Sequence, residues 1–186
     1  MALSPCQRSK LESMFTTFYD INRDGKIEWA DFTEFIEKIS AVNGWGETHE
    51  KRTSGLSTLK TIWEGLIKYA DENFDNEVSH DEWFKMWDDV MKEATSKDKF
   101  PQWLNDYMNF MFDVTDTSGD GIVDEGEYVK AFQQYGVSDA KCKEAFQKFT
   151  NNGALKLDKK AFENLWHQYF TSSDENCLAN HLFPRA

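Results

Sequence analysis

The chain has 186 residues and carries 33 acidic side chains against 21 lysines and arginines, for a formal net charge of −12. This length suits one sizeable domain or two closely packed halves. The acidic balance argues against nucleic acid or an anionic membrane surface as a partner. No apolar run is long enough for a membrane span, and the sequence does not begin with a secretory signal. Three cysteines make no even disulfide framework, so we expect a cytoplasmic protein.

The first predicted unit is a helix, a polar loop over residues 20–31 and a second helix. Apolar residues at helical spacing flank the loop on both sides. Oxygen-bearing side chains stand at loop positions 1, 3, 5, 9 and 12, position 7 offers a backbone carbonyl, and Gly25 stands at position 6, where glycine turns cheaply. The predicted ligands are Asp20, Asn22, Asp24, Lys26 (through its carbonyl), Glu28 and Asp31. This spacing is that of an EF-hand loop, which wraps a calcium ion in six to eight oxygens.

A second unit follows after a long connection at residues 43–55, which is either a loop or an extension of the next helix. Residues 71–82 repeat the loop pattern between two apolar helical stripes, with Asn76 in place of glycine at position 6. The predicted ligands are Asp71, Asn73, Asp75, Glu77 (through its carbonyl), Ser79 and Glu82. We therefore expect a second calcium site here.

The third unit has its loop at residues 116–127, with Gly121 at position 6. Its predicted ligands are Asp116, Ser118, Asp120, Ile122 (through its carbonyl), Asp124 and Glu127. Each loop taken alone has a simpler reading as a polar surface turn. Three matches in one chain, each between apolar helical stripes, favour three calcium sites instead.

The fourth unit keeps the spacing of the motif but lacks its metal-binding carboxylates. Residues 150–161 have an apolar residue, Leu157, at position 8, as the other loops do. Positions 1, 5 and 12 are Thr150, Ala154 and Ala161, which offer no carboxylate. We predict an EF-hand that folds and binds no ion; an ordinary helix-turn-helix would bind none either.

The four units predict an all-α fold with two EF-hand pairs in one compact body and a short two-stranded bridge between the loops of each pair. EF-hands pair through position 8, so we expect Ile27 to meet Val78 and Val123 to meet Leu157. The predicted parts are an N-terminal pair at 1–92, a C-terminal pair at 101–170 and a tail at 171–186. The tail's apolar pair, Leu182 and Phe183, either docks on the body or belongs to a frayed end.

With these residues established, the chain resembles the invertebrate sarcoplasmic calcium-binding proteins of the EF-hand superfamily, and within that family the calexcitins. The resemblance covers nearly the whole chain and rests on its length, four units, three intact loops and a degenerate fourth. It implies a compact four-EF-hand body and, for a calexcitin-like role, calcium-dependent action on a target such as an ion channel. Nucleotide binding, which is attributed to calexcitins, gets no support, because the chain has no G-x-x-x-x-G-K-[ST] phosphate loop.

Three classes of function are compatible with such a chain to different degrees. An enzyme is disfavoured, because the four histidines are scattered and no nucleophile–base set has credible spacing. A calcium-signalling protein that binds three Ca²⁺ and changes conformation to regulate a target is our prediction. A cytosolic Ca²⁺/Mg²⁺ buffer is the alternative, with Mg²⁺ expected above all in the first loop, because Asp31 is shorter than glutamate.

Overall fold

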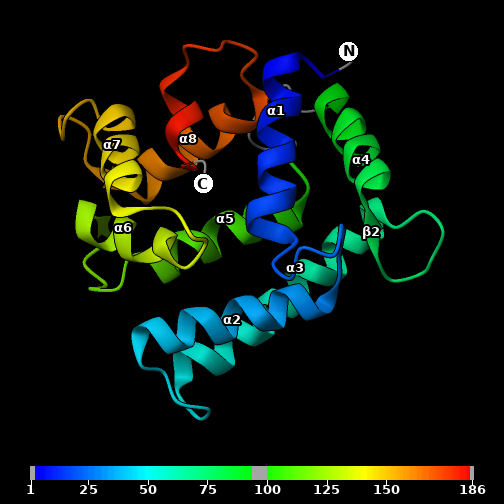
Figure 1. Ribbon diagram of the computed structural model, residues 1–186, viewed down its shortest axis with the longest axis horizontal. Helices are drawn as coiled ribbons and strands as arrows, with labels where there is room; N and C mark the ends of the chain where they lie inside the picture. The colour runs from blue at the N-terminus through cyan, green and yellow to red at the C-terminus, as the bar shows by residue number, and fades with distance from the viewer. Residues whose placement is uncertain (1–2, 94–99, 185–186) are drawn as a thin grey trace. The chain divides into compact units, whose positions relative to one another are not determined.

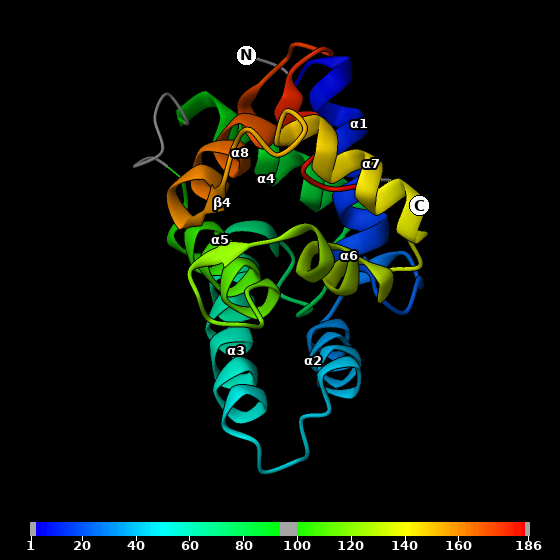
Figure 2. The same cartoon turned by 90° about the vertical axis from the view of Figure 1, so that its left-hand side faces the viewer.

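The computed structural model describes residues 3–93 and 100–184 of the chain. The chain divides into two compact units, Met1–Tyr107 and Met108–Ala186. Both units are built of helices, and each contains one two-stranded antiparallel sheet (Figures 1 and 2). The predicted all-α fold with short bridges between paired loops is confirmed.

Helices and strands follow each other in the order that the four-unit pattern predicts. In the first unit they are α1 (Pro5–Met14), the π-helical turn η1 (Phe15–Tyr19), β1 (Lys26–Ile27), α2 (Trp29–Asn43), α3 (Glu50–Ala70), β2 (Val78–Ser79), α4 (His80–Glu93) and the start of α5 (Gln102–Thr115). In the second unit α5 ends and is followed by β3 (Ile122–Val123), α6 (Glu125–Gln133), α7 (Asp139–Phe149), β4 (Leu157–Asp158), α8 (Lys159–Thr171) and the 3₁₀ turn η3 (Leu178–His181). None of the helices within these described ranges is long and apolar enough to cross a membrane.

Local sequence signals set where the first helices begin and end. Ser4 caps α1: its hydroxyl accepts the Gln7 backbone N–H at 3.2 Å, and the Gln7 side chain accepts the Ser4 N–H at 2.9 Å. Gly44 ends α2 with a φ of +70°, a left-handed conformation that favours glycine. The long connection is a loop only as far as His49, and its remainder lengthens α3 by its first turns. Both readings of residues 43–55 are therefore right in part.

The two bridges have the register that the loops predict. Ile27 lies opposite Val78 in the first sheet, and Val123 lies opposite Leu157 in the second. All four side chains are buried, so each pair of loops is tied to the core of its own unit. Loop four keeps its place in the second bridge, with Leu157 buried, although it lacks carboxylates at positions 1, 5 and 12.

An aromatic cluster fills the core of the first unit. Trp83 contacts Trp87 edge-on at a ring distance of 5.7 Å, and Trp87 contacts Trp103 in the same manner at 6.4 Å. All three side chains are buried, so the cluster joins α4 to the first turn of α5. The backbone of α3 approaches this cluster closely, because Gly65 faces Trp103.

The close approach at Gly65 gives a test of this packing. A Cβ at position 65 would lie 2.5 Å from the Cβ of Trp103, where no rotamer change relieves the clash. Gly65→Ala should therefore destabilise the protein by about 1–3 kcal/mol, the usual cost of overpacking. Gly46→Ala is the matched control, since a Cβ there meets nothing within 4 Å. Urea unfolding of both variants makes the measurement; equal stability for the two would contradict the packing described here.

Candidate metal centres

The three predicted calcium loops share an unusual backbone. In each of them the residues at loop positions 4 and 6 have positive φ angles. These residues are Arg23 and Gly25 at +62° and +91°, Phe74 and Asn76 at +61° and +62°, and Gly119 and Gly121 at +73° and +82°. Positive φ strains a bulky side chain, so Phe74 holds this conformation against its own preference. The same two bends in three different sequences show that one loop geometry is built three times.

The first carboxylate of each loop organises the turn behind it. Asp20 accepts the Gly25 N–H at 3.0 Å, Asp71 accepts the Asn76 N–H at 3.0 Å, and Asp116 accepts the Gly121 N–H at 2.9 Å. A second backbone N–H, from position 5 in loops one and two and from position 4 in loop three, reaches the other oxygen of the same carboxylate. Position 1 therefore fixes the chain around position 6 in all three loops.

The last carboxylate of each loop closes it into a ring. One oxygen of Asp31 accepts the N–H groups of Ile21 and Asn22, at 2.9 and 3.1 Å, and the other accepts that of Glu28 at 2.8 Å. Position 12 thus joins the start of the loop to position 9, where the next helix begins.

Loops two and three are closed by glutamates in the same way. Glu82 joins the N–H of Glu72 to that of Ser79, at 3.1 and 2.9 Å. Glu127 joins the N–H of Ser118 to that of Asp124, at 2.8 and 3.1 Å. The shorter Asp31 makes the same closure, so the loss of one methylene is absorbed within loop one.

The predicted ligands at positions 3 and 5 make hydrogen bonds within the turn between these two carboxylates. Position 5 accepts the N–H of position 7 in every loop: Asp24 from Lys26 at 3.2 Å, Asp75 from Glu77 at 3.0 Å and Asp120 from Ile122 at 2.8 Å. At position 3, Asn22 and Asn73 donate through their side-chain amides to the position 5 carboxylate, at 3.1 and 2.8 Å. Ser118 instead donates to Asp116, at 3.3 Å.

Position 12 differs electrostatically between loops one and two. The Asp31 carboxylate is buried, and this burial raises its pKa against three backbone hydrogen bonds that act to lower it. Slight burial acts in the same direction on Glu82, but hydrogen bonds from Ser79 and from the Glu72 backbone outweigh it and lower the pKa of Glu82. The charged form of Asp31 is therefore the harder one to maintain without a nearby cation.

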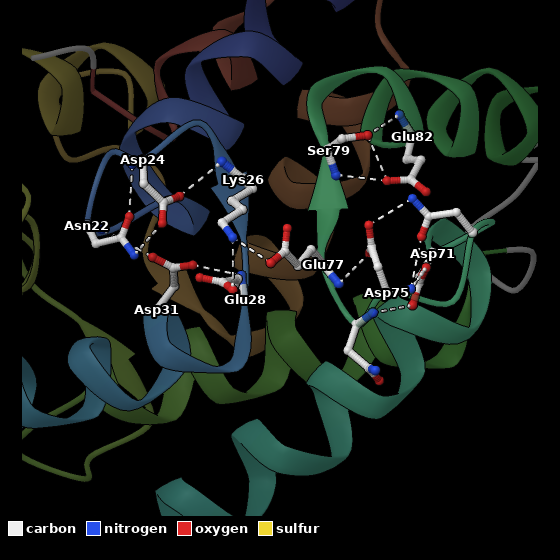
Figure 3. A network of polar contacts seen from close by, with 12 residues as sticks. Asn22, Asp24, Lys26, Glu28, Asp31, Asp71, Asp75, Glu77, Ser79 and Glu82 are labelled. Atoms are coloured by element: carbon white, nitrogen blue, oxygen red, sulfur yellow. Dashed lines mark hydrogen bonds and ion pairs between the residues drawn. The ribbon is translucent and has the colours of Figure 1, made fainter.

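An ion pair across the first bridge was not anticipated from the sequence. The Lys26 ammonium lies 2.5 Å from a Glu77 oxygen and 3.2 Å from a Glu28 oxygen. Figure 3 shows both contacts. Its hydrogen bond to Glu77, with Glu28 beside it, raises the pKa of Lys26. The two position 7 side chains thus point to each other across the bridge. The predicted register of the bridge already indicated this ion pair, because diagonal neighbours across an antiparallel bridge are within reach of long side chains.

Loop four has another backbone as well as other side chains. Its positive φ angles fall at Asn151, Asn152 and Gly153, which are positions 2 to 4. The Thr150 hydroxyl donates to the Phe146 carbonyl at 2.6 Å and accepts the Gly153 N–H at 3.1 Å. The one carboxylate, Asp158, caps α8 by accepting the Ala161 N–H. Nothing at position 12 closes a ring.

The donor sets of loops one to three fit a hard divalent cation. Carboxylate, amide and carbonyl oxygens are the ligands that Ca²⁺ takes, and each carboxylate has about four lone-pair sites, of which the backbone uses only some. Within residues 3–93 and 100–184, no three Asp, Glu, His or Cys side chains already stand together as a metal cage. The backbone geometry and the donor oxygens of these loops therefore fit such an ion.

Comparison with known proteins gives close relatives, although no family model matches the chain. Calexcitin-1 of Caenorhabditis elegans is 30% identical over 185 residues, which cover 97% of this chain and 87% of the relative. Sarcoplasmic calcium-binding proteins I, III and IV of Branchiostoma lanceolatum are 30% identical over 170 residues, covering 91% and 92%. The solved structure of a sarcoplasmic calcium-binding protein from amphioxus superposes with a TM-score of 0.82 at 28% identity, over 96% of this chain and 98% of the other.

These similarities extend over both units, so they concern the whole architecture and not one loop. They agree with the fold described above. The chain belongs to the family of calcium-binding EF-hand proteins that includes calexcitin and the sarcoplasmic calcium-binding proteins.

Proposed function

We propose that loops 20–31, 71–82 and 116–127 each bind one calcium ion and that the chain acts by binding, without catalysis. The observation that carries this proposal is the ring closure at position 12, which recurs in these three loops through Asp31, Glu82 and Glu127. That carboxylate is the bidentate ligand of an EF-hand loop. Loop four has an alanine there and a different backbone, so we exclude it from the set.

Calcium stoichiometry tests the three sites. Calorimetry on metal-stripped protein should give three ions, and Glu82→Gln and Glu127→Gln should each remove one, because the amide supplies one oxygen in place of two. Asp81→Asn is the matched control: it removes one exposed charge at position 11 of loop two and no ligand. A fourth tight ion, or an unchanged stoichiometry in both glutamine variants, would contradict the assignment.

Loop one is proposed to hold Mg²⁺ as well as Ca²⁺. Asp31 uses both its oxygens to close the loop with a side chain one methylene shorter than glutamate, so its two oxygens reach less far toward an ion. Single-oxygen ligation suits six-coordinate Mg²⁺ at about 2.0–2.1 Å better than seven-coordinate Ca²⁺. The buried carboxylate also gains most from a nearby divalent charge, whichever ion supplies it.

Asp31→Glu should raise the calcium preference of loop one, because the longer side chain offers a second oxygen to the ion. Asp31 borders a cavity beside Phe35, Leu59 and Tyr107. The measurement is calcium titration of parent and variant in millimolar magnesium. Magnesium should weaken one of the three parent sites selectively and lose most of that effect in the variant. Equal weakening of all sites in both proteins would refute the proposal.

The structure supports a closed calcium-binding protein better than an open sensor. Calcium sensors bind targets through exposed, methionine-rich apolar grooves. Here Met14, Met86, Met108 and Met111 are buried. In the second unit the chain's own tail covers aromatic side chains of α6 and α8. We therefore propose Ca²⁺/Mg²⁺ buffering as the function that this geometry favours.

Regulation of a target, such as an ion channel, remains the second candidate. It is favoured by two exposed aromatic side chains beside loop two, Tyr69 at 55% and Phe74 at 84% exposure. Phe74 lies inside the loop itself and is held at a positive φ, so calcium binding there bears directly on its position. The charge of three calcium ions would also halve the formal net charge of −12, so that the surface would repel an acidic partner less.

An apolar dye separates the two roles. For a buffer we expect dye fluorescence to fall or stay constant as calcium is added to metal-stripped protein, because the ions tighten the aromatic core. A rise that saturates with the third ion would instead support target regulation. Phe74→Ser identifies the source: if the rise disappears in this variant and its calcium stoichiometry stays at three, the surface beside loop two is the responsive one.

A further inference from the structure

The tail after α8 is a packed part of the second unit and not a frayed end. The 3₁₀ turn η3 (Leu178–His181) contacts α7 and α8, and the side chains of Ala179, Leu182 and Phe183 are buried. The Leu182 N–H donates to the Ala179 carbonyl at 3.0 Å. Of the two readings of this segment from the sequence, docking is correct.

Phe183 is the anchor of the tail. Its ring meets Tyr169 at 4.9 Å, Trp166 at 5.4 Å and Phe132 at 5.9 Å, each contact edge-on. Tyr169 and Trp166 belong to α8, and Phe132 belongs to α6. The tail therefore joins the helix that leaves loop three to the helix that leaves loop four.

A single buried hydroxyl links this anchor to loop three. Tyr128 donates its hydroxyl proton to the Leu182 carbonyl at 2.8 Å, and its side chain is fully buried. A buried Tyr hydroxyl needs such a partner, since an unpaired one is costly. Tyr128 directly follows Glu127, the carboxylate that closes loop three. A shift of Glu127 toward or away from an ion thus moves the residue that holds the tail.

We infer that tail docking and calcium binding at loop three are coupled, with Tyr128 as the positioning residue between them. The inference rests on the calcium site proposed for loop three. We take its sign from the closed ring of Glu127, which ties position 3 of loop three to position 9 and which occurs together with the docked tail. The docked tail favours the ion at loop three, and the ion favours the docked tail, because a coupling free energy acts equally in both directions.

Site-resolved calcium titration tests the coupling in the full chain. The Gly25 and Gly121 N–H groups donate to the position 1 carboxylates of loops one and three, so glycine-labelled NMR reports each loop separately. Phe183→Ala and Tyr128→Phe should weaken calcium binding at the Gly121 loop by about fivefold or more. Both should leave the Gly25 midpoint unchanged. Leu178→Ala, in the same tail but 52% exposed, is the control and should change neither.

The reciprocal measurement is hydrogen exchange at the Leu182 amide. Glu127→Gln should speed this exchange in saturating calcium, and Glu82→Gln, which acts on loop two, should not. Equal Gly121 midpoints in the parent, Phe183→Ala and Tyr128→Phe overturn the coupling and leave the calcium site standing. A Gly121 amide that ignores calcium in the parent protein overturns the site itself. Tyr128→Phe keeps the buried ring, so its result does not depend on whether Phe183→Ala folds.

Discussion

Two antiparallel bridges, each two residues long, fix where every loop of this protein lies. Ile27 with Val78 and Val123 with Leu157 are buried on both sides, so each loop is held by its partner as well as by its own helices. Apolar burial at these positions is insensitive to what the rest of the loop binds. This is why loop four keeps its place although it offers no carboxylate at positions 1, 5 and 12. Its contribution is to complete the pair in which loop three stands.

Within each unit, repulsion between the loop carboxylates destabilises the fold and burial of aromatic side chains stabilises it. The chain carries a net charge of −12, and carboxylates concentrate in three short loops, where they repel each other at close range. Backbone N–H groups offset part of this repulsion by pairing with the carboxylates of positions 1, 5 and 12. Buried tryptophan, tyrosine and phenylalanine side chains stabilise the core of each unit. A divalent ion completes what the N–H groups begin, so loop order and ion binding are linked.

The three loops are alike in backbone and unlike in surroundings. Burial raises the pKa of Asp31 in loop one, hydrogen bonds lower the pKa of Glu82 in loop two, and Glu127 of loop three adjoins a tyrosine that holds the tail. Such differences act on affinity and metal preference without altering the ligand pattern. We therefore expect three sites that share a mechanism and respond differently to magnesium and to changes elsewhere in the chain.

The sequence by itself determined the local part of this protein: the helix–loop–helix units, the ring of oxygen-bearing residues and the apolar pairing at position 8. The units and the ring follow from spacing within about twelve residues, and the pairing follows because EF-hand loops meet at position 8. Tertiary structure decided what depends on residues far apart in sequence. The burial of Asp31 and the hydrogen bond from Tyr128 to Leu182 depend on residues that no spacing rule connects. Packing brings these groups together, because apolar burial selects the arrangement and the polar groups must then find partners within it.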